Sequence, residues 1–265
     1  MSEILNWHDG ELTTHPLIDA SDRGYLVGHG IFETLLVDNA HVEFLDRHLE
    51  RLAGSWAQIG QGALDVGEIT QAVSQVINAN SQASKLARLR ITVTLNNDRA
   101  SALVTLAPMT QWPTTTSCIA VPWEFSSSSP LTGIKSTSYA ANILATQWAQ
   151  GQGFSEGLIV NTRGEIVEGT ASNIFVVLDG EVVTPALSSG PLPGIIRGLL
   201  LESGLVQQAV ISPVDLERAS EVFLTSSTRG VHPVDRCGDR VFRVIGPRTR
   251  EASRYIDELR ILDRQ

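Results

Sequence analysis

Hydrophobic and polar positions in the first part of the chain follow two different periods. Apolar residues recur at spacings of three and four over 48–59 and 65–78, which predicts two amphipathic helices. Other segments are strand-like and are joined by turn-forming residues such as Asp9-Gly10 and Asn96-Asn97-Asp98. These predicted strands lie within 4–12, 31–45, 89–95 and 102–106. We therefore expect a mixed sheet with two helices here.

The second part of the chain combines a helix with consecutive hairpins. A Pro-, Thr- and Ser-rich interval at 113–132 predicts a connecting loop. A helix is expected over 139–150, with Ile143, Leu144 and Trp148 facing inward. Hairpins with helices at intervals predict an α+β fold and not a doubly wound sheet. The further predicted elements are hairpins over 157–168 and 173–184, a strand at 221–224 and a helix over 249–262.

The length of 265 residues favours two domains. We predict a smaller N-terminal α/β domain over 1–112, a connecting loop over 113–132 and a C-terminal domain over 133–265. The net charge of -9 and the isoelectric point near 5.1 argue against nucleic acid or an anionic membrane as the main partner.

The cysteines and the N-terminus bear on the compartment. Cys118 and Cys237 are far apart and lack metal-ligand spacing, so we predict no metal site and a reducing, cytoplasmic location. Residues 1–10 include charged side chains and no apolar run, so neither a signal peptide nor a transmembrane span is expected.

Lys135 is the most unusual chemical feature of the sequence. The chain contains only two lysines, Lys85 and Lys135, and all its other basic side chains except histidine are arginines. Lys135 lies among small and apolar residues, where partial burial favours a neutral amine that can form a Schiff base. A lysine at a loop tip is the ordinary alternative.

Three other features could bind an anion. Pro191-Leu192-Pro193-Gly194 precedes a predicted helix, whose first N–H groups form a ready anion site. The segment 225–230 is rich in hydroxyl groups, and Arg47 and Arg51 lie four residues apart on one helix face. Each feature alone is commonly structural or solvated. Together with the lysine they suit a phosphate-bearing aldehyde cofactor.

Several motifs occur in a family-like order: Asp22-Arg23-Gly24, the stretch 28–34, His48-Leu49-Glu50-Arg51-Leu52, the stretch 133–142, Glu168-Gly169-Thr170-Ala171-Ser172-Asn173-Ile174-Phe175, Leu192-Pro193-Gly194-Ile195-Ile196-Arg197 and the segment 224–234. With them the chain resembles the class IV aminotransferases, pyridoxal-phosphate enzymes of fold type IV. The resemblance covers nearly the whole chain. It implies a two-domain, D-amino acid aminotransferase-like α+β fold, with pyridoxal 5′-phosphate in the crevice between the domains and the C-terminal domain binding it. It also implies a homodimer that acts on a small-molecule substrate.

The resemblance assigns roles around the cofactor ring. Lys135 matches the Schiff-base lysine, which then transfers protons. Glu168 matches the carboxylate that keeps the pyridine nitrogen protonated, so that the ring accepts electrons from a carbanion. Tyr139 matches a tyrosine that several members place near the ring 3-oxygen. A solvated glutamate and a buried tyrosine are the ordinary alternatives for the last two.

The resemblance also assigns the phosphate ligands. Arg51 matches the phosphate-binding arginine, whose planar fork suits a dianion. Ile195 and Ile196 would donate backbone N–H groups, and Ser227 and Thr228 would add hydroxyl or N–H donors.

The subfamily is indicated by the residues around the predicted strand at 31–37. Phe32-Glu33 stands where D-amino acid transaminases have a Tyr-Glu pair, and Leu95 stands where they have an arginine. Thr34 replaces the glycine common in the longer branched-chain enzymes. The stretch 28–34 and the compact length look most like 4-amino-4-deoxychorismate lyases, although His29 departs from the aspartate common there.

The function implied is conversion of 4-amino-4-deoxychorismate to 4-aminobenzoate and pyruvate in folate synthesis, with Lys135 as base. Phe32, Arg99 and Arg229 are candidates for the substrate-binding residues. One alternative is an aminotransferase acting on branched-chain or D-amino acids with 2-oxoglutarate. Another is an inactive paralogue that binds a cofactor or other small molecule. Retention of both Lys135 and Glu168 argues against that last possibility.

Overall fold

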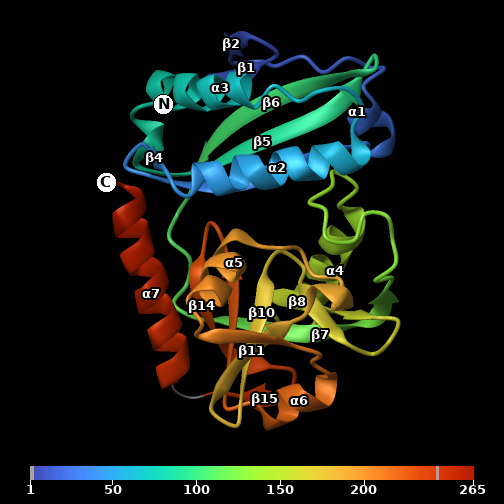
Figure 1. The fold of residues 1–265 in the computed structure, drawn as a ribbon, viewed down its shortest axis with the longest axis vertical. Coiled ribbons are helices and arrows are strands. Elements are labelled where there is room, and N and C mark those ends of the chain that lie inside the picture. The colour runs from blue at the N-terminus through green and yellow to red at the C-terminus, as the bar shows by residue number, and fades with distance from the viewer. Residues whose placement is uncertain (1–2, 243–244) are drawn as a thin grey trace. The chain divides into compact units, whose positions relative to one another are not determined.

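The computed structural model describes residues 3–242 and 245–265, which divide into two compact units (Figure 1). Unit 1 consists of the residues up to Gln111 together with Ile134–Tyr139 and Arg264, and unit 2 consists of the remaining described residues. The segment that carries Lys135 therefore packs with unit 1, although it follows the first strand of unit 2 in sequence. The domain boundaries at 112 and 133 stay predictions.

Unit 1 is built on a six-stranded antiparallel sheet with the strand order β2-β1-β6-β5-β3-β4. Its elements are β1 (Asn6–His8), β2 (Glu11–Thr13), α1 (Arg23–Val27), β3 (Gly30–Asp38), β4 (His41–Val42), α2 (Leu45–Ile59), α3 (Val66–Ala79), the short 3-10 helix η1 (Ala83–Lys85), β5 (Leu86–Asn96) and β6 (Arg99–Pro108).

Helices α2 and α3 pack on one face of this sheet. The apolar residues predicted from the helical period are buried there, among them Leu52 and Trp56 of α2 and Ile69 of α3. They meet alternate residues of the strands, such as Ile31 and Leu35 of β3. The predicted helices and hairpins of this part of the chain are confirmed.

Unit 2 is built on a mixed sheet with the order β12-β11-β10-β13-β14-β7-β8-β9, and β15 pairs with β14 at the side. Three neighbouring pairs are parallel: β11–β12, β14–β7 and β7–β8. The elements are β7 (Thr116–Phe125), α4 (Ala140–Gly151), β8 (Glu156–Asn161), β9 (Ile166–Gly169), β10 (Asn173–Leu178), β11 (Glu181–Pro185), the 3-10 helix η2 (Leu187–Ser189), α5 (Ile195–Glu202), β12 (Val206–Ala209), α6 (Pro213–Arg218), β13 (Glu221–Ser226), β14 (Gly230–Cys237), β15 (Arg240–Val241) and α7 (Pro247–Asp263).

The loop predicted over 113–132 is wrong in its first half. Strand β7 occupies Thr116–Phe125 and pairs with β14 and β8 inside the sheet. Pro122 interrupts the apolar alternation of this strand, and the register shifts between Ala120 and Glu124. A proline within a run argues against a strand in sequence, yet it is tolerated where the pairing is irregular.

The inward face predicted for helix α4 is wrong for Ile143 and Leu144, two of its three residues. Ala145 and Ala149 are fully buried, whereas Ile143 and Leu144 are 50% and 60% exposed. The helix approaches β8 so closely that a Cβ on Gly157 would lie 3.1 Å from the Ala145 carbonyl oxygen. Only small side chains fit on that face, so Ile143 and Leu144 point outward. Trp148 is half-buried and its ring meets that of Trp123 edge to face at 5.9 Å.

In the part of the chain that the structure describes, no helix combines the length and the apolar character needed to cross a bilayer.

Candidate active site

The Lys135 segment is fixed to strand β3 by backbone hydrogen bonds. The Phe32 N–H donates to the Lys135 carbonyl at 2.8 Å, and the Thr137 N–H donates to the Gly30 carbonyl at 2.9 Å. Ser136 forms an isolated antiparallel bridge with Ile31 between them. The segment is therefore held as a short extra strand, which fixes the place from which the Lys135 side chain emerges.

The Lys135 amine lies beside two aromatic rings. Its Nζ is 4.5 Å from the centre of the Phe32 ring and 5.4 Å from that of Tyr139. The two rings meet edge to face at 5.3 Å. Lys135 is half-buried, whereas Lys85 is exposed. These rings shield one side of the amine from water and bring three predicted site residues together.

Arg90 is a cation beside this group that the sequence did not single out. Its Cζ lies 3.7 Å from the centre of the Phe32 ring, and its Nε donates to Thr92 Oγ1 at 3.0 Å. Among the described residues, no carboxylate pairs with it. Burial, followed by repulsion from Arg88, lowers the pKa of the Arg90 guanidinium. Arg90 could bind an anionic substrate group. In the sequence, Arg90 is distinguished only as an arginine within a predicted strand of alternating apolar and polar residues.

Arg51 is engaged by a buried carboxylate of the same unit. Its Nε and Nη2 donate to the two oxygens of Glu33 at 2.8 and 2.5 Å, and Glu33 also contacts His48 Nδ1 at 2.7 Å. Burial favours the neutral acid, but Arg51 and the hydrogen bonds from His48 and Arg51 outweigh it and lower the pKa of Glu33 to about 2. Burial lowers the pKa of His48. The phosphate role of Arg51 stays a prediction.

In unit 2, Glu168 is held at the end of β9. Its Oε2 accepts hydrogen bonds from the Leu192 N–H at 3.0 Å and from Asn173 Nδ2 at 3.2 Å. The same Asn173 amide donates to the Leu192 carbonyl at 2.9 Å. Asn173 thus joins the Glu168 carboxylate to the segment that leads into helix α5. Its place in the Ser172-Asn173-Ile174 motif was visible in the sequence, but this role was not.

Helix α5 begins immediately after Gly194, which offers no side chain to cap the first turn. A Cβ on Gly194 would lie 2.0 Å from Asn173 Oδ1, so only glycine allows this close approach. The side chains of Ile195 and Ile196 are 8% and 1% exposed, so both are anchored in the interior. The first-turn N–H groups of a helix have no partner within the helix, so those of Ile195 and Ile196 could bind an anion, and this role stays a prediction.

The hydroxyl-rich turn lies at the same end of the sheet. Thr225 of β13 is paired with Asn173 of β10, so their side chains share one face. Within residues 3–242 and 245–265, the buried Thr225 hydroxyl has no hydrogen-bond partner. Ser227 and Thr228 follow in a turn closed by the Arg229 N–H on the Ser226 carbonyl at 3.2 Å. An unsatisfied buried hydroxyl beside a helix N-terminus suits an oxyanion.

The two arginines predicted to bind substrate occupy different environments. Arg99 is exposed at the start of β6, in the hairpin with Asn96. The Arg229 Nη1 donates to Glu156 Oε2 at 2.5 Å, and its guanidinium lies 4.3 Å from the centre of the Trp112 ring. Their substrate roles stay predictions. Among the described residues, no group of His, Cys, Asp and Glu side chains is arranged to hold a metal ion.

The family described as "Amino-transferase class IV" matches residues 30–237, which is most of the chain. The chain belongs to the class IV aminotransferase family. The resemblance noted in the sequence is thereby confirmed. Members of this family depend on pyridoxal 5′-phosphate, which is therefore the cofactor.

One relative of this class IV aminotransferase-family protein spans almost its whole length. A Methanocaldococcus jannaschii protein provisionally named a branched-chain-amino-acid aminotransferase is 26% identical over 276 aligned residues, 92% of this chain and 91% of the relative.

Two solved structures share its fold. A hypothetical aminotransferase from Mycobacterium tuberculosis in its PLP-bound form has a TM-score of 0.88 at 22% identity and covers 98% of this chain and 99% of that one. A Legionella pneumophila protein provisionally named a 4-amino-4-deoxychorismate lyase has a TM-score of 0.84 at 24% identity, with 92% and 96% covered. The predicted α+β architecture of fold type IV enzymes is confirmed.

The side chains suit this cofactor. The α5 N-terminus suits a phosphate, as does the Thr225 hydroxyl, which has no hydrogen-bond partner among the described residues, and a half-buried lysine beside two aromatic rings suits an aldehyde. The position of the cofactor in a crevice between domains stays a prediction.

Proposed function

We propose that this protein is a 4-amino-4-deoxychorismate lyase, which releases 4-aminobenzoate and pyruvate. The observation that carries the proposal is the Phe32–Lys135–Arg90 arrangement in unit 1. The Lys135 amine and the Arg90 guanidinium both lie against the Phe32 ring, and Arg90 has no carboxylate partner among the described residues. A substrate with two carboxylates needs such a cation, and a base must reach the carbon next to its amine.

Lys135 would bind the aldehyde of the cofactor and, once released, would act as the base. Lys135 then removes the proton from the amine-bearing ring carbon. Pyridoxal 5′-phosphate, when bound, supplies the electron sink for the electron pair left on that carbon. Glu168 would keep the ring nitrogen of the bound cofactor protonated. The enolpyruvyl group leaves as pyruvate and the ring becomes aromatic, so the products contain all the atoms of the substrate and no second substrate is needed.

Other residues bind and orient. The first-turn N–H groups of α5 at Ile195 and Ile196, with Ser227, Thr228 and Arg51, would hold the phosphate. Tyr139 would lie near the ring 3-oxygen. Arg90 would bind a substrate carboxylate, and Arg99 and Arg229 remain further candidates.

A homodimer is part of this proposal. Four apolar side chains close together in sequence are strongly exposed in unit 1, which is unusual for a monomer surface. They are Leu17 (84%), Tyr25 (74%), Leu26 (58%) and Val27 (64%). We also propose a cytoplasmic location, on the basis of the two unpaired cysteines.

A second candidate is a branched-chain aminotransferase. The M. jannaschii relative has that name, and it aligns with this chain over nearly its whole length. The assay that separates the two supplies 4-amino-4-deoxychorismate alone, then L-leucine or D-alanine with 2-oxoglutarate. We expect equal amounts of 4-aminobenzoate and pyruvate in the first reaction without an amino acceptor. Glutamate formation only in the second would contradict the lyase proposal.

A further inference from the structure

Two turns of unit 2 lie at one end of its sheet. The β9–β10 turn (Gly169–Ser172) directly follows Glu168, and the β13–β14 turn (Ser227–Arg229) contains the predicted phosphate donors. Asn173 at the start of β10 pairs with Thr225 near the end of β13. Antiparallel neighbours place the start of one strand beside the end of the other, so both turns are at the same edge.

Glu156, the first residue of β8, joins these two turns with its two carboxylate oxygens. Oε1 accepts the Ala171 N–H at 2.9 Å and the Ser172 hydroxyl at 2.7 Å. Oε2 accepts Arg229 Nη1 at 2.5 Å. One carboxylate therefore holds the turn next to Glu168 and, through Arg229, the turn with Ser227 and Thr228.

This pair is buried and closely packed. The side chains of Glu156 and Arg229 are 2% and 11% exposed. A Cβ on Gly169 would lie 2.5 Å from Glu156 Oε1, so the turn sits directly on the carboxylate. Trp112 packs against the Arg229 guanidinium. Loss of either charge would leave the other buried without compensation. We therefore expect the Glu156–Arg229 pair to hold the turn that contains Arg229 firmly in place.

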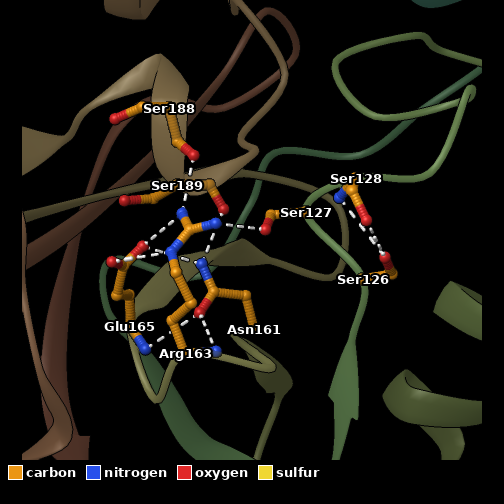
Figure 2. Close-up of polar contacts among 8 residues, drawn as sticks. All are labelled: Ser126, Ser127, Ser128, Asn161, Arg163, Glu165, Ser188 and Ser189. Atoms are coloured by element: carbon orange, nitrogen blue, oxygen red, sulfur yellow. Dashed lines mark hydrogen bonds and ion pairs between the residues drawn. The ribbon is translucent and has the colours of Figure 1, made fainter.

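A second ion pair, at the opposite end of β8, can be compared with the Glu156–Arg229 pair. Arg163 and Glu165 follow β8 and form an ion pair at 2.7 Å, with side chains 48% and 17% exposed. Figure 2 shows this cluster, in which Arg163 also donates to Ser127 Oγ and the Ser188 carbonyl. The chemistry of the two pairs is the same, but this one lies away from both turns and is screened by water.

We propose that Glu156 is a positioning residue for the cofactor phosphate, acting through Arg229 and the two turns. The inference rests on the proposed function, because it assigns the phosphate to the α5 end of unit 2. It predicts a selective effect. Disturbing Glu156 displaces the β13–β14 turn and weakens binding of the phosphorylated cofactor more than binding of the same ring without phosphate.

The test measures dissociation constants of pyridoxal 5′-phosphate and of pyridoxal for the cofactor-depleted protein, by visible absorbance below the unfolding temperature. The variants are Glu156→Gln, Arg229→Met and Arg229→Lys, with Glu165→Gln as the matched control. We expect the first two to raise the constant for pyridoxal 5′-phosphate about tenfold and that for pyridoxal less than about threefold. Arg229→Lys, which keeps the cation, should retain most of the affinity, and Glu165→Gln should match the wild type.

The outcomes separate the possible explanations. Wild-type affinity in Glu156→Gln would overturn the inference and leave the proposed function intact. Normal cofactor affinity in Arg229→Met with a raised KM would also overturn it, and would assign Arg229 to the substrate. Equal losses for both ligands would indicate general destabilisation and overturn it as well. A wild-type protein that binds neither ligand would contradict the proposed function itself.

Discussion

Glu33 shows how a single buried carboxylate organises its neighbours. Its ionised form is opposed by burial but stabilised by Arg51 and His48, so the ion pair exists only while the partners remain in place. In the sequence, Glu33 stands out only as the residue after Phe32, where it helps to indicate the subfamily. Its spacing from His48 and Arg51 on the following helix could have predicted a contact, but not the direction in which Arg51 points.

The lowered pKa of Glu33 predicts a defined loss of stability in acid. The unfolded chain takes up the proton near the ordinary value of 4.5 and the folded chain only near about 2. The stabilisation is therefore complete above pH 4.5 and is lost as the pH falls toward 2. It amounts to on the order of 3 kcal/mol. Urea unfolding between pH 6 and pH 2 measures it.

The control for this prediction is the exposed Glu50 of α2. Glu33→Gln should flatten the dependence of the unfolding free energy on pH between 4.5 and 2, whereas Glu50→Gln should leave the wild-type slope. Identical slopes in wild type and Glu33→Gln would show that the ion pair does not contribute.

Arg90 gives a second prediction at this scale. Arg90→Met removes the proposed carboxylate ligand, and a charge-assisted hydrogen bond contributes about 1.5–3 kcal/mol. The KM for 4-amino-4-deoxychorismate should rise about tenfold to hundredfold. Affinity for pyridoxal 5′-phosphate should not change. Arg88→Met, in an exposed position two residues away, should behave as wild type. Unchanged steady-state kinetics in Arg90→Met would exclude Arg90 as a ligand.

Helices and strands differ in how much of them the sequence could reveal. The helical stripe of α3 and the hairpin turn at Asn97-Asp98, whose φ angles are +47° and +59°, follow from local physical preferences and are confirmed. Strand β7 depends on two parallel partners distant in sequence, and the exposed side of α4 depends on the close approach of Gly157. Local patterns do not contain that information.

The start of helix α5 should be sensitive to one added methyl group at Gly194. Gly194→Ala places a Cβ against Asn173 Oδ1, so the helix start or the asparagine must move, at a cost of about 1–3 kcal/mol. Cofactor affinity should fall with it, which equilibrium titration measures. Gly198→Ala in the same helix meets nothing closer than Glu202 Oε1 at 3.9 Å.

The Gly198→Ala control should leave the folded protein unchanged in stability or more stable by about 0.5–1 kcal/mol, because alanine favours the helix. If Gly194→Ala binds the cofactor as tightly as Gly198→Ala, the first turn of α5 does not hold the phosphate.

The candidate residues of the whole molecule divide between its two units. Lys135, Tyr139 and Arg51 belong to unit 1, whereas Glu168 and helix α5 belong to unit 2. Ordered motifs identified the family and the fold, because they record which residues the chemistry needs. They could not identify Arg90 or Glu156, or separate Thr225 from the other hydroxyl groups of 225–230, because the environments of these residues arise only when strands distant in sequence pair.

Lys135 is the amine that we propose is joined to the cofactor, and because the chain has only two lysines the attachment site can be measured directly. Borohydride reduction of the cofactor-loaded protein, followed by peptide mass mapping, locates the pyridoxyl group on Lys135 or on the exposed Lys85. We expect one pyridoxyl group per chain, on the peptide that contains Lys135. A group on Lys85, or a protein that carries none, would contradict it.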